Sequence, residues 1–264
     1  MKRTIAIAAL ALCASAAFAQ FSDTFDSIDP AWVTDRYEPN GFQSAFFDGD
    51  NRLKITIDPA DAYNNRPSGY NTSTFYNTQG RQRPGGNIGP DWTVSGDVYI
   101  SSDMLTSGFN WRTDLWTRDN NANENNAFYG IFGAKRFDDS DPFNEGATNK
   151  SNVWRIWDAD TANGWVTLAD AVTTGWHNLA ITSHGSTADY YLDGNLVYTD
   201  ADASLASPEL RTVFVQAYNF SDATHTPASA YSVYWDNINA VPEPASMLVI
   251  AGLAAVAARK KRKS

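Results

Sequence analysis

The sequence predicts an all-β domain, residues 20–240, between an N-terminal export signal and a C-terminal membrane segment. In this region, short runs rich in Val, Ile, Tyr, Phe, Trp and Thr alternate with clusters of Gly, Asn, Asp and Pro, the pattern of strands and turns. No window of twelve or more residues in it shows a convincing helical period. Its 221 residues are enough for one large β-sandwich with a real core.

The first nineteen residues have the parts of a secretory signal peptide. Residues 2–3 are Lys and Arg, and the apolar stretch Thr4–Leu12 follows them. Ala17 and Ala19 then give the small-x-small pattern of a cleavage site, so the mature chain is expected to begin at Gln20. The predicted signal peptide is therefore residues 1–19.

Cys13 is the only cysteine of the chain and lies inside this signal peptide. It raises the alternative of a lipoprotein, because Leu10-Ala11-Leu12-Cys13 has the outline of a lipobox. Leu12 is too large for the position before the cysteine, where a small residue is expected, so ordinary signal cleavage is favoured. The mature domain then has no disulfide bond and must be held by packing or bound ions.

Strands are expected throughout the first two-thirds of the domain. In the clearest of them, Val94, Gly96, Val98 and Ile100 fall on one face, because alternate residues of a strand point to the same side. The predicted strands are Phe42–Phe47, Leu53–Ile57, Thr74–Asn77, Asp91–Ser101, Ala127–Ala134 and Val153–Asp158.

The segments between these strands are predicted to be loops. Residues 63–70 and 80–90 are rich in Asn, Arg, Gly and Pro. Residues 119–126 (DNNANENN) are low in complexity and expected to be solvated, and residues 138–146 (DDSDPFNEG) are acidic and turn-forming. Long loops on a rigid sheet are common sites of binding.

Residues 175–200 predict three antiparallel strands in a row. Trp176 to Thr182 alternates, with Leu179 and Ile181 on the face opposite Trp176. The chain turns after His184, returns, and turns again at Asp193-Gly194, a pair that favours the positive φ values of a tight hairpin. These residues therefore form a β-meander.

This meander resembles the corresponding part of concanavalin A-like and laminin-G-like jelly rolls. The resemblance rests on Gly175-Trp176-His177, on the strand that ends in Asp193-Gly194, and on the closing strand Tyr231–Ala240. It implies a two-sheet antiparallel sandwich of about a dozen strands with a concave face. Members bind glycans, bind calcium or hydrolyse polysaccharides, and the fold alone does not choose among these.

The last residues, 241–264, form a separate segment with three parts. Val241-Pro242-Glu243-Pro244 is expected to be extended and accessible, because proline fits neither a strand ladder nor a helix interior. The apolar residues Ala245–Ala258 can enter a bilayer as a single helix. The basic run that follows stays on the cytoplasmic side; it is Arg259, Lys260, Lys261, Arg262 and Lys263.

The apolar block is short, since fourteen residues rise only about 21 Å as a helix, against a hydrocarbon core of roughly 30 Å. It spans the membrane only if the Pro-Glu-Pro end and the snorkelling Arg259 and Lys260 supply the missing length. The alternative is a buried C-terminal helix of a soluble domain. The five cations that directly follow the block favour the membrane segment.

This tail resembles the PEP-CTERM sorting signal. The resemblance rests on Pro242-Glu243-Pro244, the short apolar span and the terminal basic cluster. It implies export, transient anchoring in the inner membrane, and recognition of the Pro-Glu-Pro segment by an exosortase, a membrane-embedded cysteine transpeptidase. Family members are then released or attached at the cell surface, often among exopolysaccharide.

The charge of the exported domain is more negative than that of the chain. The leader and tail hold seven of the 20 basic residues and one of the 30 acidic residues, which leaves 13 basic and 29 acidic side chains and a net charge of −16. Nucleic acid is a poor partner for such a surface. The acids serve solubility or bind divalent cations.

The sequence does not predict an enzyme. Hydrolases of this fold carry two carboxyls on one strand as Glu-x-Asp-x-x-Glu, a spacing that aims them at one face. No Glu-x-Asp occurs in this chain, and the four glutamates of the domain fall in expected loops. These are Glu38, Glu124, Glu145 and Glu209.

Two kinds of binding site have candidates. Calcium prefers carboxylate and carbonyl oxygens, which Asp138, Asp139 and Asp141 offer in the acidic loop and Asp236 offers in the last strand. Glycans stack on aromatic rings flanked by polar groups. The best such segment contains Trp111, Arg112, Asp114 and Trp116, although core positions are the favoured interpretation for both tryptophans.

These observations favour an exported surface protein whose jelly-roll domain binds extracellular polysaccharide without catalysis. The alternatives are a structural matrix or envelope protein without a specific ligand, and a divergent glycoside hydrolase.

Overall fold

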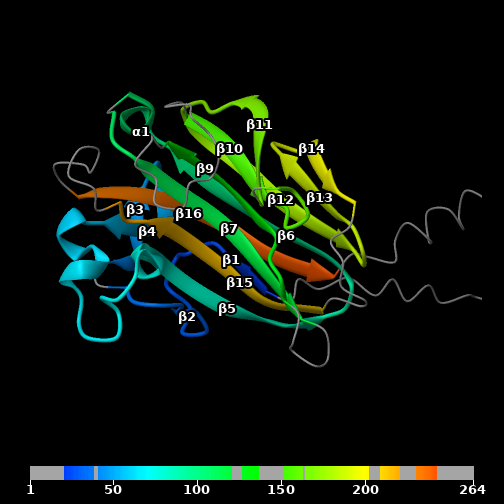
Figure 1. The fold of residues 1–264 in the computed structure, drawn as a ribbon, viewed down its shortest axis with the longest axis horizontal. Helices are drawn as coiled ribbons and strands as arrows, with labels where there is room; N and C mark the ends of the chain where they lie inside the picture. The colour runs from blue at the N-terminus through cyan, green and yellow to red at the C-terminus, as the bar shows by residue number, and fades with distance from the viewer. Residues whose placement is uncertain are drawn as a thin grey trace, which may run out of the picture.

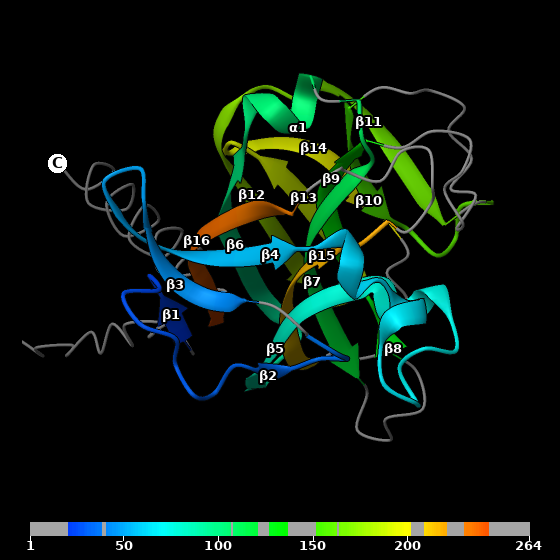
Figure 2. The same ribbon diagram turned by 90° about the vertical axis from the view of Figure 1, so that its left-hand side faces the viewer.

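The structure is a computed structural model that describes residues 21–38, 41–106, 108–120, 127–136, 152–162, 164–201, 209–220 and 230–242. In these residues the chain forms two antiparallel sheets of eight strands each, packed face to face (Figures 1 and 2). The predicted all-β, two-sheet jelly-roll sandwich is therefore confirmed.

The first sheet has the strand order β14-β13-β12-β6-β16-β4-β3. The short strand β1 also belongs to it and pairs with the C-terminal half of β16. The register places Phe21 opposite Ala240, so the start of the domain lies beside its last strand. The strands are β1 (Phe21–Asp23), β3 (Phe42–Phe47), β4 (Asp50–Ile57), β6 (Asp91–Ile100), β12 (Gly175–His184), β13 (Ala188–Leu192), β14 (Asn195–Asp200) and β16 (Tyr231–Pro242).

The second sheet has the order β11-β10-β9-β7-β15-β5-β2, with β8 paired to β7. Its strands are β2 (Val33–Thr34), β5 (Thr78–Ile88), β7 (Trp111–Asn120), β8 (Ala127–Phe128), β9 (Ile131–Arg136), β10 (Asn152–Trp157), β11 (Trp165–Ala171) and β15 (Glu209–Tyr218). The described helices are short: η1 (Pro59–Asp61), η2 (Tyr63–Asn65), η3 (Thr74–Asn77) and α1 (Ser102–Thr106).

The core fills the space between the sheets with alternate residues of each strand. Val94, Val98 and Ile100 of β6 are fully buried, as their spacing predicts. Four tryptophans are also 0% exposed in this layer, and each large apolar side chain contributes about 1.5–3 kcal/mol when fully buried. They are Trp92, Trp111, Trp154 and Trp235.

The meander of β12, β13 and β14 forms as predicted. Leu179 and Ile181 are fully buried on the inner face. Asp193 and Gly194 have φ values of 51° and 78°, which is the conformation that a two-residue hairpin requires. The Asp193 carboxylate also accepts a hydrogen bond from the backbone N–H of Asn178 at 2.8 Å, which ties the turn to β12.

Three local predictions are wrong. The predicted strand Ala127–Ala134 is interrupted, because β8 ends at Phe128 and β9 begins at Ile131. Thr74–Asn77 is a 3-10 helix and not a strand, because the Asn77 side chain turns back to accept a hydrogen bond from the Tyr63 backbone at 2.6 Å. Residues 80–90, expected as a loop, lie mostly in β5. A Cβ at Gly80 would lie 2.1 Å from the Val215 carbonyl oxygen, so glycine there permits close strand pairing.

Candidate functional site

The outer face of the second sheet brings together most of the predicted glycan-binding residues. Alternation along β7 directs Arg112, Asp114 and Trp116 to this outer face. Thr113 and Leu115, between them, are fully buried toward the first sheet. The predicted cluster therefore divides between two faces of one strand.

Trp111 lies on the inner face of β7 and is therefore not part of the candidate glycan-binding surface. Its side chain is 0% exposed in the core, and its indole N–H donates to Asn152 at 3.2 Å. The core interpretation holds for Trp111 because an odd spacing separates it from Arg112, Asp114 and Trp116. Trp116 is partly exposed.

Trp116 belongs to a row of apolar side chains that crosses five neighbouring strands. The register places it between Phe214 of β15 and Ile131 of β9, and Trp157 of β10 and Trp165 of β11 continue the row. We call these five residues the aromatic row. Its three tryptophans are partly exposed, whereas Phe214 and Ile131 are 5% and 6% exposed.

Close contacts fix the ring positions in the aromatic row. The rings of Trp157 and Trp165 meet edge to face, with centroids 5.1 Å apart and an interplanar angle of 73°. A Cβ at Gly164 would lie 2.2 Å from the Trp157 ring, so only glycine fits against that indole. The Trp116 and Phe214 centroids are 6.1 Å apart. The row is therefore largely pre-formed.

An ion-pair cluster lies beside the aromatic row. The Asp114 carboxylate receives Arg112 Nε at 2.6 Å and Arg155 Nη2 at 3.2 Å. A Cβ at Gly133 would lie 2.2 Å from Asp114 Oδ1, so this glycine makes room for the carboxylate. Burial favours the neutral carboxyl, but the two arginines outweigh it and hold the pKa of Asp114 below its usual range.

The arginines of this cluster also contact the tryptophans. The guanidinium of Arg155 lies 3.6 Å from the Trp165 ring centroid, and that of Arg112 lies 5.6 Å from it. These distances fall within the range of cation–π attraction. Trp165 therefore covers the ion-pair cluster and joins it to the aromatic row.

A second carboxyl borders this face from the loop after β2. Asp35 accepts a hydrogen bond from the Gln216 amide at 2.6 Å and pairs with Arg36 at 2.6 Å. Gln216 lies opposite Asp114 in the sheet register. Burial raises the pKa of Asp35, although Arg36 and Gln216 oppose this shift.

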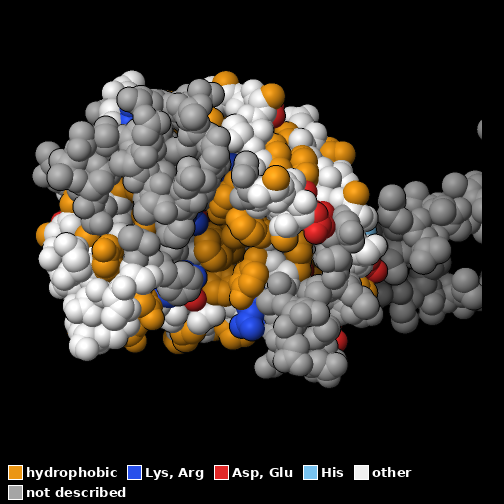
Figure 3. Space-filling model, in the orientation of Figure 1, with side chains coloured by type: hydrophobic (Ala, Val, Ile, Leu, Met, Phe, Trp, Pro, Cys, Tyr) orange, Lys and Arg blue, Asp and Glu red, His pale blue; other side chains and the backbone are white. Residues whose placement is uncertain are grey.

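The surface over the second sheet is hollowed. In Figure 3, which has the orientation of Figure 1, hydrophobic side chains line a depression that arginine or lysine side chains border. Apolar rings beside hydrogen-bonding groups are the composition of a sugar-binding surface.

Each glutamate of the domain that the structure describes pairs with an arginine. In the described part of the chain they are Glu38 and Glu209, which pair with Arg81 and Arg211 at 2.9 Å and 2.8 Å. Glu124 and Glu145 lie outside the described residues.

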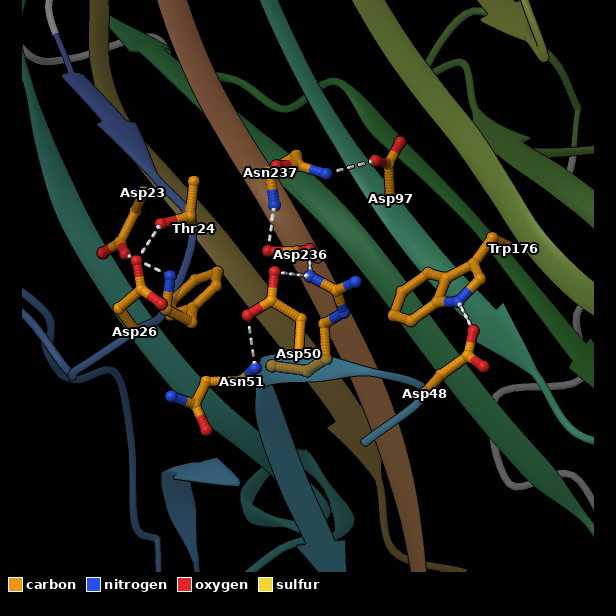
Figure 4. A network of polar contacts seen from close by, with 12 residues as sticks. Asp23, Thr24, Asp26, Asp48, Asp50, Asn51, Asp97, Trp176, Asp236 and Asn237 are labelled. Carbon is orange, nitrogen blue, oxygen red and sulfur yellow. Dashed lines mark hydrogen bonds and ion pairs between the residues drawn. The ribbon is translucent and has the colours of Figure 1, made fainter. Parts of the chain in front are cut away.

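Asp236, a candidate calcium ligand, is paired with an arginine side chain of the domain. It is 2% exposed, forms an ion pair with Arg52, and accepts the Asn237 backbone N–H at 2.8 Å (Figure 4). Burial raises its pKa despite Arg52. Asp138, Asp139 and Asp141 lie outside the described residues.

The first two residues of the predicted sorting tail, Val241 and Pro242, belong to strand β16. Pro242 is the last residue of β16 and lies opposite Trp92, so the ladder reaches two residues beyond the expected end of the domain. Among the described residues, no helix is long and apolar enough to cross a membrane. The other sequence-predicted signal residues lie outside the described ranges: Ala17, Ala19, Gln20, Glu243, Pro244, Arg259, Lys260, Lys261, Arg262 and Lys263.

Sequence reasoning missed four members of the aromatic row and Arg155. The alternation of Trp154, Ile156 and Trp157 shows that Trp157 faces away from the core. Nothing in the spacing aligns Trp157 with Trp116, because the register between strands is set by the fold.

Residues 240–263 match the family described as the PEP-CTERM protein-sorting motif. A comparison with curated proteins gave no match.

The described sandwich is similar to several solved structures. A glycoside hydrolase family 16 endo-glucanase from Bacteroides ovatus has a TM-score of 0.52 and 13% identity over 83% of this chain and 99% of that one. A Bacteroides ovatus mixed linkage glucan PUL GH16 protein has a TM-score of 0.54 and 12% identity, with the same coverage. At this identity the likeness shows the fold alone.

The two findings concern different parts of the chain, which together account for most of its length. The chain is a concanavalin A-like jelly-roll sandwich that ends in a PEP-CTERM sorting motif, and this motif marks it as an exported protein that an exosortase sorts.

Proposed function

We propose that the exported domain binds a polysaccharide on the outer face of the second sheet and does not cleave it. The observation that carries this proposal is the aromatic row, which sets three partly exposed tryptophans across neighbouring strands. A row of rings suits a chain of sugar units, because each ring offers an apolar surface to one sugar face.

The neighbouring polar groups support the same function. Arg112 and Asp114 are 5% and 1% exposed, and Arg155 is 1% exposed. Buried and mutually paired, they hold the rings in place and take little part in direct contact. The surface is therefore rigid, which lowers the entropic cost of binding an extended ligand.

Binding is tested with truncations of the row. Trp116→Ala and Trp157→Ala each remove a stacking contribution of about 1 kcal/mol, which weakens the affinity by roughly fivefold. The control is Trp176→Ala, a partly exposed tryptophan in the first sheet. Affinity electrophoresis in mixed-linkage β-glucan and in exopolysaccharide from the host measures the effect.

The outcomes separate the alternatives. Loss of retardation in the two row variants, with Trp176→Ala unchanged, supports binding on this face. Equal retardation of all variants contradicts it. No retardation of the wild type in either polysaccharide favours a structural protein without a specific ligand.

A divergent hydrolase is the second candidate, because the environments of Asp35 and Asp114 push their pKa values in opposite directions. Binding remains favoured, since Asp114 is 1% exposed and paired with two arginines, which leaves its carboxylate little access to a ligand. Release of reducing ends from β-glucan that stops in Asp35→Asn would establish the hydrolase instead.

A further inference from the structure

Arg118 has no partner in the part of the chain that the structure describes. Every other described arginine forms an ion pair or donates a hydrogen bond, whereas Arg118 does neither and contacts no aromatic ring. Its Nε is buried without an acceptor, although the residue as a whole is partly exposed. A buried donor without an acceptor costs free energy, so this guanidinium offers a place for an acceptor that a ligand supplies.

Arg118 lies on the face that carries the aromatic row. It belongs to β7, two residues after Trp116, and its neighbours Thr117 and Asp119 are fully buried on the side of the first sheet. Alternation along the strand therefore directs Arg118 outward together with Trp116. Alternate Cα atoms of a strand are about 6.6 Å apart, so a sugar that stacks on Trp116 can also contact Arg118.

Trp116 provides a second unpaired donor beside Arg118. Its indole Nε1 is buried and has no hydrogen-bond partner among the described residues. Neither an indole N–H nor a guanidinium can accept a hydrogen bond, so both groups call for acceptor oxygens. Two such donors on one face of one strand, one of them charged, match a ligand group with several oxygens and a negative charge.

The positive charge of Arg118 is not matched by an acid of the described domain. On the same face, Arg112 and Arg155 share the carboxylate of Asp114. The exported domain holds 13 basic and 29 acidic side chains, so an arginine that pairs with no acid runs against its overall charge. That overall charge repels an acidic polymer, and a positive contact on the binding face offsets the repulsion.

We propose that the polysaccharide bound by the aromatic row is acidic, and that Arg118 binds a carboxylate of a sugar that stacks on Trp116. This inference rests on the proposed binding function and names the class of ligand, a polysaccharide that contains uronic acids. The two oxygens of a carboxylate match the planar guanidinium. In a uronic acid this group is attached directly to the sugar ring, which places it beside the indole. Arginine or lysine side chains border the hydrophobic depression of this face (Figure 3).

The test compares two polymers that share one backbone. Mixed-linkage β-glucan is neutral, and oxidation of its C6 hydroxyls converts part of its glucose to glucuronate. Isothermal titration calorimetry of the purified full-length chain is expected to show about fivefold tighter binding to the oxidised polymer, the contribution of one partly exposed ion pair. This preference is expected to disappear in about 1 M NaCl, where the screening length is about 3 Å.

Arg118→Gln removes the charge and keeps a polar side chain. The variant is expected to bind both polymers with the affinity of the wild type for the neutral one, because the aromatic row is unchanged. Lys54→Gln is the matched control, since it removes one cation from a partly exposed position of β4 in the first sheet. It is expected to keep the fivefold preference.

The outcomes separate this inference from the proposed function. The same comparison is made with exopolysaccharide from the host, before and after chemical reduction of its carboxyls. Equal affinity of the wild type for the two members of each pair overturns the role of Arg118 and leaves polysaccharide binding in place, as does a preference that persists in Arg118→Gln. Absence of binding to all four preparations refutes polysaccharide binding itself, and this inference with it.

Discussion

Gly133 decides whether Asp114 can lie between its two arginines. A Cβ there would lie 2.2 Å from both Asp114 Oδ1 and the Thr113 carbonyl oxygen. Gly133→Ala is therefore expected to lower the free energy of unfolding by about 2 kcal/mol, measured by urea denaturation. Gly89→Ala is the control, because nothing lies within 4 Å of its added Cβ. Equal stability of the two variants would refute this account.

Asp119 gives the domain a specific dependence on pH. Burial raises its pKa well above the ordinary 3.8, so the folded state holds this proton more tightly than the unfolded state does. This contribution is present at low pH and lost as pH rises above 3.8 toward the folded pKa. The wild type is therefore expected to lose stability relative to Asp119→Asn as pH rises.

The measurement is the urea midpoint of both proteins between pH 4 and pH 7. Asparagine keeps the shape of the side chain and carries no charge, so the difference isolates Asp119 from the other acids. Parallel pH profiles would show that Asp119 does not titrate as its burial requires.

Within one strand, the alternation of hydrophobic and polar residues predicts which face of the sheet each side chain occupies. It does not predict how neighbouring strands are aligned. The inward positions of β6 and β12 follow from the sequence, because hydrophobic residues recur at every second position. The same alternation separates Trp111 from Trp116. The aromatic row needs the alignment of five strands from distant segments, which no spacing within one strand contains.

The errors in β5 and η3 arise from local composition that tertiary contacts override. Glycine and proline in residues 78–88 indicate a loop, yet β5 pairs with β15 over most of its length. Its short partner β2 covers only Gln82 and Arg81, so much of β5 is an edge where such residues are tolerated. The strand propensity of Thr74–Asn77 is likewise a weak preference.

At the scale of the molecule, the sorting motif predicts processing in the host. Intact mass and cell fraction are compared for the wild type and a variant with Pro242→Ala and Glu243→Ala. The wild type is expected to lose a mass that matches removal of the tail, and the variant to keep it, because the exosortase reads this segment. A wild type that stays full-length in the membrane would rule out this processing.

The pairing of β1 with β16 has a mechanical consequence. Because Phe21 lies opposite Ala240, the tail departs from beside the point where the domain begins. A tether at the tail therefore attaches to the first sheet, beside the strand with which the domain begins. The aromatic row lies on the outer face of the second sheet, so the attachment point and the proposed ligand surface belong to different sheets.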